Sequence, residues 1–341
     1  MVTSSSGQNK KKKKLLPLAL VLFLDLLAVG VELNVFALFH HVLKLHPEAE
    51  PIVTAAAPLP AKQELPEVPE VPEVPEAAEP EEPSAPEGDF SLRFPEQFTQ
   101  GEIISDENSY RSKNLALYFT RVQQDRLIYY TTEIYVRDVH DLRTAFSGGE
   151  YYSPAKPCAE IAWRANAVAA LSGDFYYARK EGVVVRNGVL YRDTRNEDIC
   201  VIWPDGSMEC YADGEYDTAM LLDGGAWQAW GFGPSLLENG QAVTKFEHLL
   251  DYANPRAAIG CVEPGHYFFV MVEGRTYASA GMTLEQLSEL FASLGCRTAY
   301  NLDGGRSANL YWNGKLVNAD PNRFISDIIY LAEDPEEVAQ G

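Results

Sequence analysis

Between Thr283 and Gly295 the apolar side chains recur every three or four residues, which is the spacing of one face of a helix. Thr283 and Gln286 form a capping-box pair at the start of this segment, and Gly295 stands where a C-terminal cap is expected. Residues 297–302 then have strand composition. The pattern predicts an amphipathic helix followed by a strand and a short polar loop.

Other apolar runs predict strands and hairpins along residues 90–341. We expect strands at 114–120, 127–136, 145–146 and 167–171, a short helix at 157–166, and hairpins turning at Asn187-Gly188, Asp205-Gly206 and Asn313-Gly314. The predicted fold class is α+β, with a mixed β-sheet core, packed helices and several β-hairpins.

The N-terminal region has the pattern of a membrane anchor. Lys10 to Lys14 precede a mostly apolar run, 15–31, whose only charge is Asp25, and a more mixed continuation reaches residue 45. We expect residues 1–14 to be a cytoplasmic basic segment and 15–45 a single transmembrane signal anchor. A cleaved secretory signal peptide is the alternative, although no small-residue cleavage pattern follows closely.

Residues 46–89 have the composition of an extended, disordered linker. The repeat PEVPEVPEVPE begins at Pro66, where proline removes backbone donors and the glutamates repel one another. From Pro47 to Asp89 there are eleven Glu and one Asp against one Lys, about half of the formal charge of −21. The domain predicted at 90–341 is therefore only mildly acidic. Nucleic acid is not expected as a partner, because no basic stripe is present.

The five cysteines, Cys158, Cys200, Cys210, Cys261 and Cys296, have no metal-type spacing and are expected to be mostly free and buried. A two-residue turn at Asp205-Gly206 would pair Cys200 with Tyr211, placing the sulfurs of Cys200 and Cys210 on opposite faces. A disulfide between them would then need a bulge or a longer turn.

Two aspartates follow predicted buried strands and stand beside glycine. Asp303 opens the loop Asp303-Gly304-Gly305-Arg306-Ser307, and Asp174 lies in Ser172-Gly173-Asp174. Glycine allows close approach of a ligand, and strand ends commonly carry functional groups. From the residues alone a tight structural turn is the favoured interpretation of either loop, and a functional site, which the position after a buried strand supports, is the alternative.

Five ordered motifs carry a resemblance to the phosphodiester glycosidase family, over about residues 129–331. They are Ser172-Gly173-Asp174-Phe175-Tyr176, Gly231-Phe232-Gly233-Pro234-Ser235-Leu236, Asn254-Pro255-Arg256-Ala257-Ala258-Ile259-Gly260, Glu273-Gly274-Arg275, and Asn301-Leu302-Asp303-Gly304-Gly305-Arg306-Ser307. The resemblance implies an α+β domain that removes a sugar joined through its anomeric carbon to a phosphodiester. Bacterial relatives of this anchored form resemble envelope and exopolysaccharide proteins. The implied partner is a phosphorylated glycan or sugar phosphodiester.

The resemblance also suggests which residues form the site. The catalytic candidates are Asp303, Asp174 and Arg256, and the substrate-binding candidates are Arg275, Gly304, Gly305, Arg306, Ser307 and Asn301. Carboxylates would transfer protons and arginines would hold the phosphate. Glu181 and Glu273 are reserve carboxylates. No cofactor is expected, and no ligand spacing demands a divalent cation.

Four positions depart from the family pattern. Ser172 stands in place of Asn, Ala257 of Thr, Arg306 of Gly and Ala308 of Ser. The changes would either retune the site for a more anionic substrate or mark a catalytically weakened glycopolymer-binding protein. An envelope-assembly protein that uses its anchor and linker for localisation is a third reading.

Overall fold

The computed structural model describes residues 88–194, 198–246, 252–318 and 323–333. The predicted anchor at 15–45 and nearly all of the predicted linker lie outside these residues. Within the described part of the chain, no helix is long and apolar enough to cross a membrane. Phe90, near the start of the described residues, is buried, and its N–H donates to the carbonyl of Arg137.

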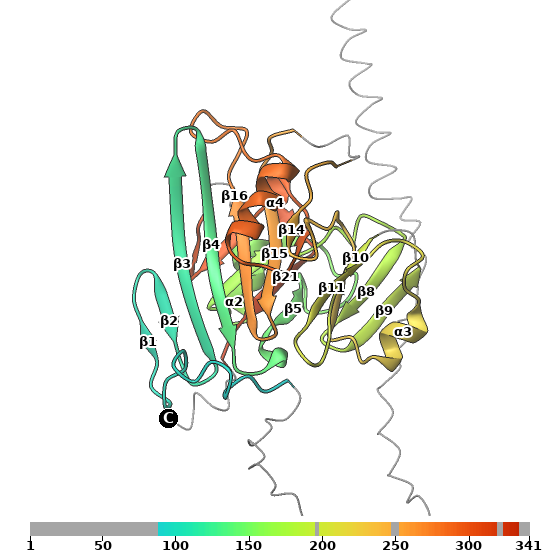
Figure 1. The fold of residues 1–341 in the computed structure, drawn as a ribbon, viewed down its shortest axis with the longest axis horizontal. Coiled ribbons are helices and arrows are strands. Elements are labelled where there is room, and N and C mark those ends of the chain that lie inside the picture. Colours follow the sequence, from blue (N-terminus) through green and yellow to red (C-terminus); the bar gives the residue numbers. More distant parts are fainter. Residues whose placement is uncertain (1–87, 195–197, 247–251, 319–322, 334–341) are drawn as a thin grey trace, which may run out of the picture. The chain divides into compact units, whose positions relative to one another are not determined.

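A seven-stranded sheet forms the largest element of the fold (Figure 1). In spatial order its strands are β1 (Ile104–Ser105), β2 (Ser109–Arg111), β3 (Leu115–Gln124), β4 (Leu127–Val136), β16 (His266–Val272), β15 (Arg256–Glu263) and β17 (Thr298–Asn301). The predicted strands at 114–120 and 127–136 are confirmed as the long β3–β4 hairpin.

Two five-stranded sheets carry the remaining longer strands. One has the order β11 (Met208–Tyr211), β10 (Ile199–Ile202), β12 (Gln228–Trp230), β8 (Gly182–Arg186), β9 (Val189–Thr194). The other has the order β19 (Lys315–Leu316), β18 (Leu310–Trp312), β7 (Ala169–Ser172), β21 (Asp327–Leu331), β5 (Arg143–Phe146). Two short pairs, β13 (Leu237–Glu238) with β14 (Gln241–Ala242) and β6 (Lys156–Pro157) with β20 (Phe324–Ile325), complete the described strands.

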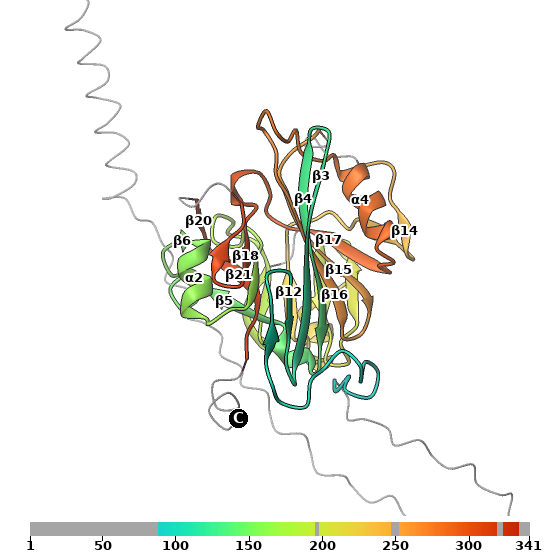
Figure 2. The ribbon, with the colours of Figure 1, turned by 90° about the vertical axis from the view of Figure 1, so that its left-hand side faces the viewer.

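The described helices are few and short. They are α2 (Cys158–Arg164), α3 (Thr218–Asp223), α4 (Leu284–Ser293), and the 3₁₀ turns η2 (Val139–Asp141) and η3 (Gly305–Ser307). The predicted capping box of α4 is present, and Gly295 has φ +80° immediately after the helix. Figure 2 shows α4 beside β15 and β17, whereas α2 packs on β21, β18 and β7.

The core explains why β15 is apolar at successive positions. Ala257, Ile259 and Cys261 face the principal core with side chains from β7, β18, β21, β10 and β12. Ala258 faces the opposite way, into a second core under α4 with Leu287. A strand buried on both faces loses the alternation of a half-exposed strand. Strands β15 and β16 were not among the predicted strands.

Two expectations are corrected. The sheets are not mixed, because all strand pairs among the described residues are antiparallel. The Cys200 hairpin also has another register, since Cys200 pairs with Cys210 and Ile202 with Met208. Residues 203–207 therefore connect the two strands, and in this turn the Asp205 carboxylate accepts from the Ser207 N–H at 2.9 Å.

Candidate functional site

The two predicted aspartate loops lie side by side. The backbone N–H of Asp303, which follows β17, donates to the carbonyl of Gly173, which follows β7, at 3.2 Å. Gly304 leaves no room for a side chain, because a Cβ built there would lie 2.8 Å from the Pro255 carbonyl oxygen. The structure therefore brings together two motifs that are about 130 residues apart in sequence.

Asp303 lies in the wall of a cavity of about 120 Å³. Ser307 and Arg323 line the same cavity, and Arg323 Nε donates to Ser307 Oγ at 3.0 Å. The remaining lining residues are mostly apolar or aromatic, namely Ala155, Phe175, Tyr177, Ala178, Phe324, Ile325 and Ser326. A carboxyl group, a hydroxyl and a guanidinium thus converge on one hollow that has aromatic rings at its edge.

The electrostatics of Asp303 suit proton transfer. Burial raises the pKa of Asp303 to about 6, although the hydrogen bond from Ser307 and the charge of Arg323 both act to lower this pKa. The nearby Asp174 carboxylate raises the pKa and the charge of Arg179 lowers it. A carboxyl group with a pKa near 6 is present in both protonation states near neutral pH, which is the condition for efficient general acid or base catalysis.

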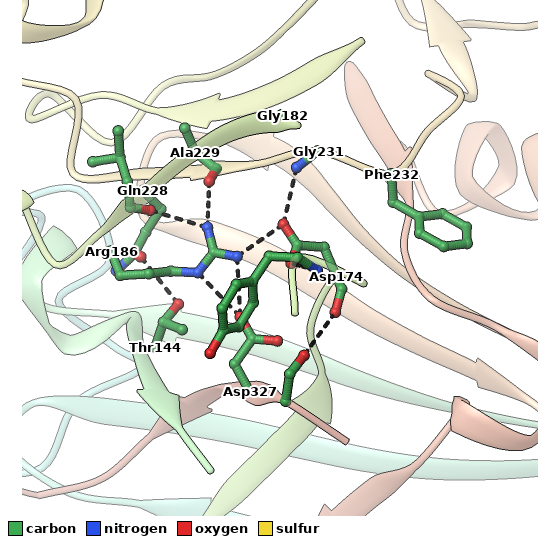
Figure 3. A network of polar contacts seen from close by, with 12 residues as sticks. Thr144, Asp174, Gly182, Arg186, Gln228, Ala229, Gly231, Phe232 and Asp327 are labelled. Atoms are coloured by element: carbon green, nitrogen blue, oxygen red, sulfur yellow. Dashed lines mark hydrogen bonds and ion pairs between the residues drawn. The ribbon is translucent and has the colours of Figure 1, made fainter. Parts of the chain in front are cut away.

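Asp174 does not line this cavity. Its side chain is 1% exposed and is paired with the Arg186 guanidinium, Nη2 to Oδ2, at 2.8 Å (Figure 3). The same carboxylate accepts from the backbone N–H groups of Tyr176 and Gly231, each at 3.0 Å. Both oxygens of Asp174 are therefore engaged inside the protein, and the group anchors the loop that supports Asp303.

Arg186 is shared between two aspartates. Its Nε donates to Asp327 Oδ2 at 3.1 Å, and its Nη1 donates to the carbonyl oxygen of Ala229. Burial raises the pKa of Asp327 to about 8, with the Asp174 carboxylate adding to the shift and Arg186 opposing it. This shift favours the protonated form of Asp327, which would bring the buried cluster close to electrical neutrality.

The two arginines predicted to hold phosphate lie elsewhere. Arg256 is 6% exposed, and its guanidinium donates to the backbone carbonyls of Met282 and Tyr252. Arg275 is exposed, donates from Nε and Nη2 to Asn254 Oδ1, and has its guanidinium beside Gly305. Arg256 holds chain segments together, whereas Arg275 borders the far side of the 303–307 loop.

The other predicted residues are distributed around the same loop. Asn301 is buried and donates to the Gly233 carbonyl at 2.7 Å, while the Gly305 N–H donates to the Pro255 carbonyl at 2.9 Å. Arg306 is exposed. The reserve carboxylate Glu273 accepts from the Tyr130 hydroxyl at 2.6 Å, and Glu181 is exposed. Only Asp303 and Ser307 of the predicted set line the cavity.

The four departures from the family pattern also lie outside the cavity wall. Ser172, Ala257 and Ala308 are buried, and the Ser172 hydroxyl accepts from the Asn309 N–H at 3.2 Å. These three buried side chains do not line this cavity, so they do not contact a group bound in it directly.

Sequence reasoning missed Arg186, Asp327 and Arg323. A signal existed for Arg186, because it is a lone charge that directly continues the apolar run Gly182 to Val185 before a turn. A charge on a buried strand requires an internal partner. Asp327 begins the apolar strand β21 in the same way. Arg323 carries no comparable signal in the sequence.

Among the described residues, no three His, Cys, Asp or Glu side chains are arranged to hold a metal ion.

The fold and cavity define an antiparallel α+β domain in which one carboxyl group, that of Asp303, lines a cavity together with Arg323. Residues 165–332 match the model of the phosphodiester glycosidase family. The SPbeta prophage-derived uncharacterized protein YomE of Bacillus subtilis is 32% identical over 168 residues, which are 46% of this chain and 26% of that protein. The match spans about a quarter of that relative.

Solved structures agree at the level of the fold. The zebrafish N-acetylglucosamine-1-phosphodiester alpha-N-acetylglucosaminidase catalytic domain, auto-inhibited by its pro-peptide, aligns with a TM-score of 0.53 and 20% identity, over 64% of this chain and 83% of that one. A hypothetical protein from Synechocystis aligns with a TM-score of 0.51 and 14% identity, over 64% and 62% of the two chains. Residues 165–332 therefore form a phosphodiester glycosidase-like domain.

Proposed function

We propose that this protein is a membrane-anchored, extracytoplasmic glycosidase that hydrolyses a sugar-1-phosphodiester in an envelope or exopolysaccharide glycan. The observation that carries the proposal is the placement of Asp303, with a pKa of about 6, in one cavity with Ser307 and Arg323. The family match over residues 165–332 supports the reaction class. Asp303 lies in a loop whose motif resembles that of the family, so the cavity and the family match point to the same residue.

Arg323 acts on the phosphate side of the scissile bond, and Asp303 acts on the side of the anomeric carbon. Arg323 neutralises the departing phosphate, which leaves as a phosphomonoester and needs no proton from the enzyme. The ionised Asp303 accepts a proton from the water that attacks the anomeric carbon, and the bond from that carbon to the phosphate oxygen breaks. The products are a free sugar and a phosphomonoester. Asp174 and Arg186 act as positioning residues, because they are buried behind the loop.

The decisive test is hydrolysis in ¹⁸O-labelled water by the full chain. Methyl phosphodiesters of glucose 1-phosphate, galactose 1-phosphate and N-acetylglucosamine 1-phosphate serve as substrates. Label recovered at the sugar anomeric carbon supports the proposed glycosidase. Label recovered in phosphate means that a phosphorus–oxygen bond is cut, and that outcome, like the absence of any product, rejects the proposal.

One observation favours the alternative of a glycan-binding protein without turnover. The cavity of about 120 Å³ is smaller than a usual small-molecule site, which holds about 300 to 1,000 Å³. It accommodates a phosphate-sized group, so most of a substrate would lie outside it. Phe175 and Phe324, which are 36% and 56% exposed at its edge, offer faces for such a sugar. Saturable binding of the same phosphodiesters without product would establish this alternative.

Replacing Arg323 by glutamine should move the pH dependence in a defined direction. With Asp303 as base, kcat/KM of the wild-type protein rises with pH through about 6. Arg323 lowers the pKa of Asp303, so its loss shifts that rise to higher pH. The missing phosphate contact also lowers kcat/KM by at least about tenfold. Lys315→Gln, which removes an exposed cation on β19, is the matched control. If the pH profile of Arg323→Gln were not shifted, Arg323 would not influence the pKa of Asp303.

The proposed topology has a separate test. The basic cluster Lys10 to Lys14 supports a cytoplasmic N-terminus, which places the domain after Phe90 outside. Protease added to intact cells or spheroplasts should digest that domain and spare a cytoplasmic marker. A domain that is cut only after lysis would reverse the orientation, and a mature chain that starts beyond residue 30 would indicate a cleaved signal.

A further inference from the structure

Cys200 and Cys210 face each other across the β10–β11 hairpin. They are direct partners in the antiparallel register, on strands joined by the turn at residues 203–207. Cys200 is fully buried in the principal core, and Cys210 is half-buried against the same core. Both side chains therefore lie on one face of the sheet, and their thiols are hydrogen-bonded to each other.

The backbone hydrogen bonds show which kind of pair this is. Trp203 N–H donates to the Ser207 carbonyl, so these two residues form a hydrogen-bonded pair. The Ile202 carbonyl instead accepts from Trp227, toward β12. Because pair types alternate along an antiparallel ladder, Cys200 and Cys210 occupy a non-hydrogen-bonded pair, in which Cα atoms are about 4.5 Å apart. That separation lies at the near edge of the range that a disulfide spans.

Access to the pair is also present. Cys210 lines a large surface cavity together with Asp198, Glu209, Pro234 and Arg297. An oxidant that enters this cavity reaches the sulfur of Cys210, whereas Cys200 is reached only through its partner. The other cysteines lack this arrangement: Cys158 is buried in the α2 core, and Cys261 and Cys296 are buried beneath the large sheet and α4.

We propose that Cys200 and Cys210 form an intrachain disulfide when the domain is in an oxidising compartment. The oxidant is a disulfide, either glutathione disulfide or a thiol–disulfide oxidoreductase. The Cys210 thiolate attacks it, forms a mixed disulfide and releases one thiol. The Cys200 thiolate then attacks the Cys210 sulfur and releases the second thiol. Two protein thiols are oxidised and one external disulfide is reduced to two thiols.

The bond would fix one wall of the cavity. It joins β10 to β11, and Asp198 immediately precedes β10 while Glu209 lies within β11. Burial raises the pKa of Cys200 well above its ordinary value, so the second step is slow in the folded protein. The bond should therefore form mainly as the domain folds.

The experiment compares the full chain purified without reductant with the same protein after reduction. Alkylation under denaturing conditions should modify three of the five cysteines before reduction and all five afterwards. Cleavage after Glu209 should leave the two peptides that contain Cys200 and Cys210 linked. Five free thiols after the denatured, reduced protein has been refolded with glutathione disulfide, or a link from Cys210 to Cys261, would overturn the proposal.

Thermal unfolding gives a second readout that does not depend on how well a variant folds. Reductant should lower the Tm of the wild-type protein by about 5 °C, because the cross-link restrains the unfolded chain. Cys210→Ala should lose this response to reductant, and Cys158→Ala, which removes a buried unpaired thiol, should keep it. A reductant response of equal size in Cys210→Ala would exclude the Cys200–Cys210 bond.

Discussion

Replacing Arg186 by methionine is expected to lower the free energy of unfolding at pH 7 by about 3 to 5 kcal/mol, because two buried aspartates lose their only shared cation. The Arg186 side chain is 1% exposed, so water cannot replace it. Chemical denaturation measures the change. Arg164→Met is the matched control, since Arg164 pairs with Glu160 at the surface and such pairs contribute at most about 1 kcal/mol.

The pH dependence of this variant has a definite sign. The pKa of Asp327 in the folded protein, about 8, is above its ordinary value, so the stability linked to its proton is present at low pH and is lost as the pH rises toward 8. Without Arg186 that pKa rises further. The deficit of Arg186→Met should therefore grow as the pH rises from 7 to 9, because Asp327 ionises beside Arg186 in the wild-type protein but keeps its proton to higher pH in the variant. A deficit that stays constant or shrinks over this range would contradict the raised pKa of Asp327.

Asp327→Asn tests the same assignment from the other partner. The raised pKa of Asp327 favours its protonated form, so an amide of the same size should change the local charge little. We expect this variant to lose much less stability than Arg186→Met.

Asp303→Asn is expected to reduce turnover of the sugar phosphodiester by about a hundredfold or more, because an amide cannot accept the proton from water. Its stability should change little, since the amide avoids the cost of a partly buried charge that raises the pKa of Asp303. Initial rates and thermal unfolding of the same preparation measure both quantities. Turnover like that of the wild-type protein would remove Asp303 from the reaction.

Asp174→Asn provides the contrast. Sequence analysis treated Asp174 and Asp303 as equivalent carboxylates, but only Asp303 lies in the cavity wall. Asp174 accepts from Arg186 and from two backbone N–H groups, so its neutral variant should lose stability together with activity. If Asp174→Asn lost activity at unchanged stability, Asp174 would have to reach the substrate directly.

The sequence pattern was sufficient to predict structure wherever contacts between neighbouring residues determine the backbone conformation. The capping box at Thr283, the positive φ at Gly295 and the Asn313-Gly314 hairpin were all predicted from a few neighbouring residues. The loop that begins at Asp303 was also identified, because its motif and its position after a strand are readable in order along the chain.

Other features depended on pairing between distant segments. Arg186 binds Asp327, which is 141 residues away in the sequence, and no local pattern indicates which buried charged residues pair with each other. The register of the Cys200 hairpin depended on whether the turn uses two residues or five, which hydrogen bonds at Asp205 and Trp203 decide.

The sequence by itself determined the family-like motifs, the α4 helix and Asp303 as a candidate. Tertiary structure alone decided that Arg323 accompanies Asp303 in the cavity, that Asp174 is an anchor and that Arg256 binds backbone carbonyls. The physical reason is that burial and charge pairing are properties of the packed chain. A side chain acquires its pKa, its partners and its access to solvent only when segments remote in sequence close around it.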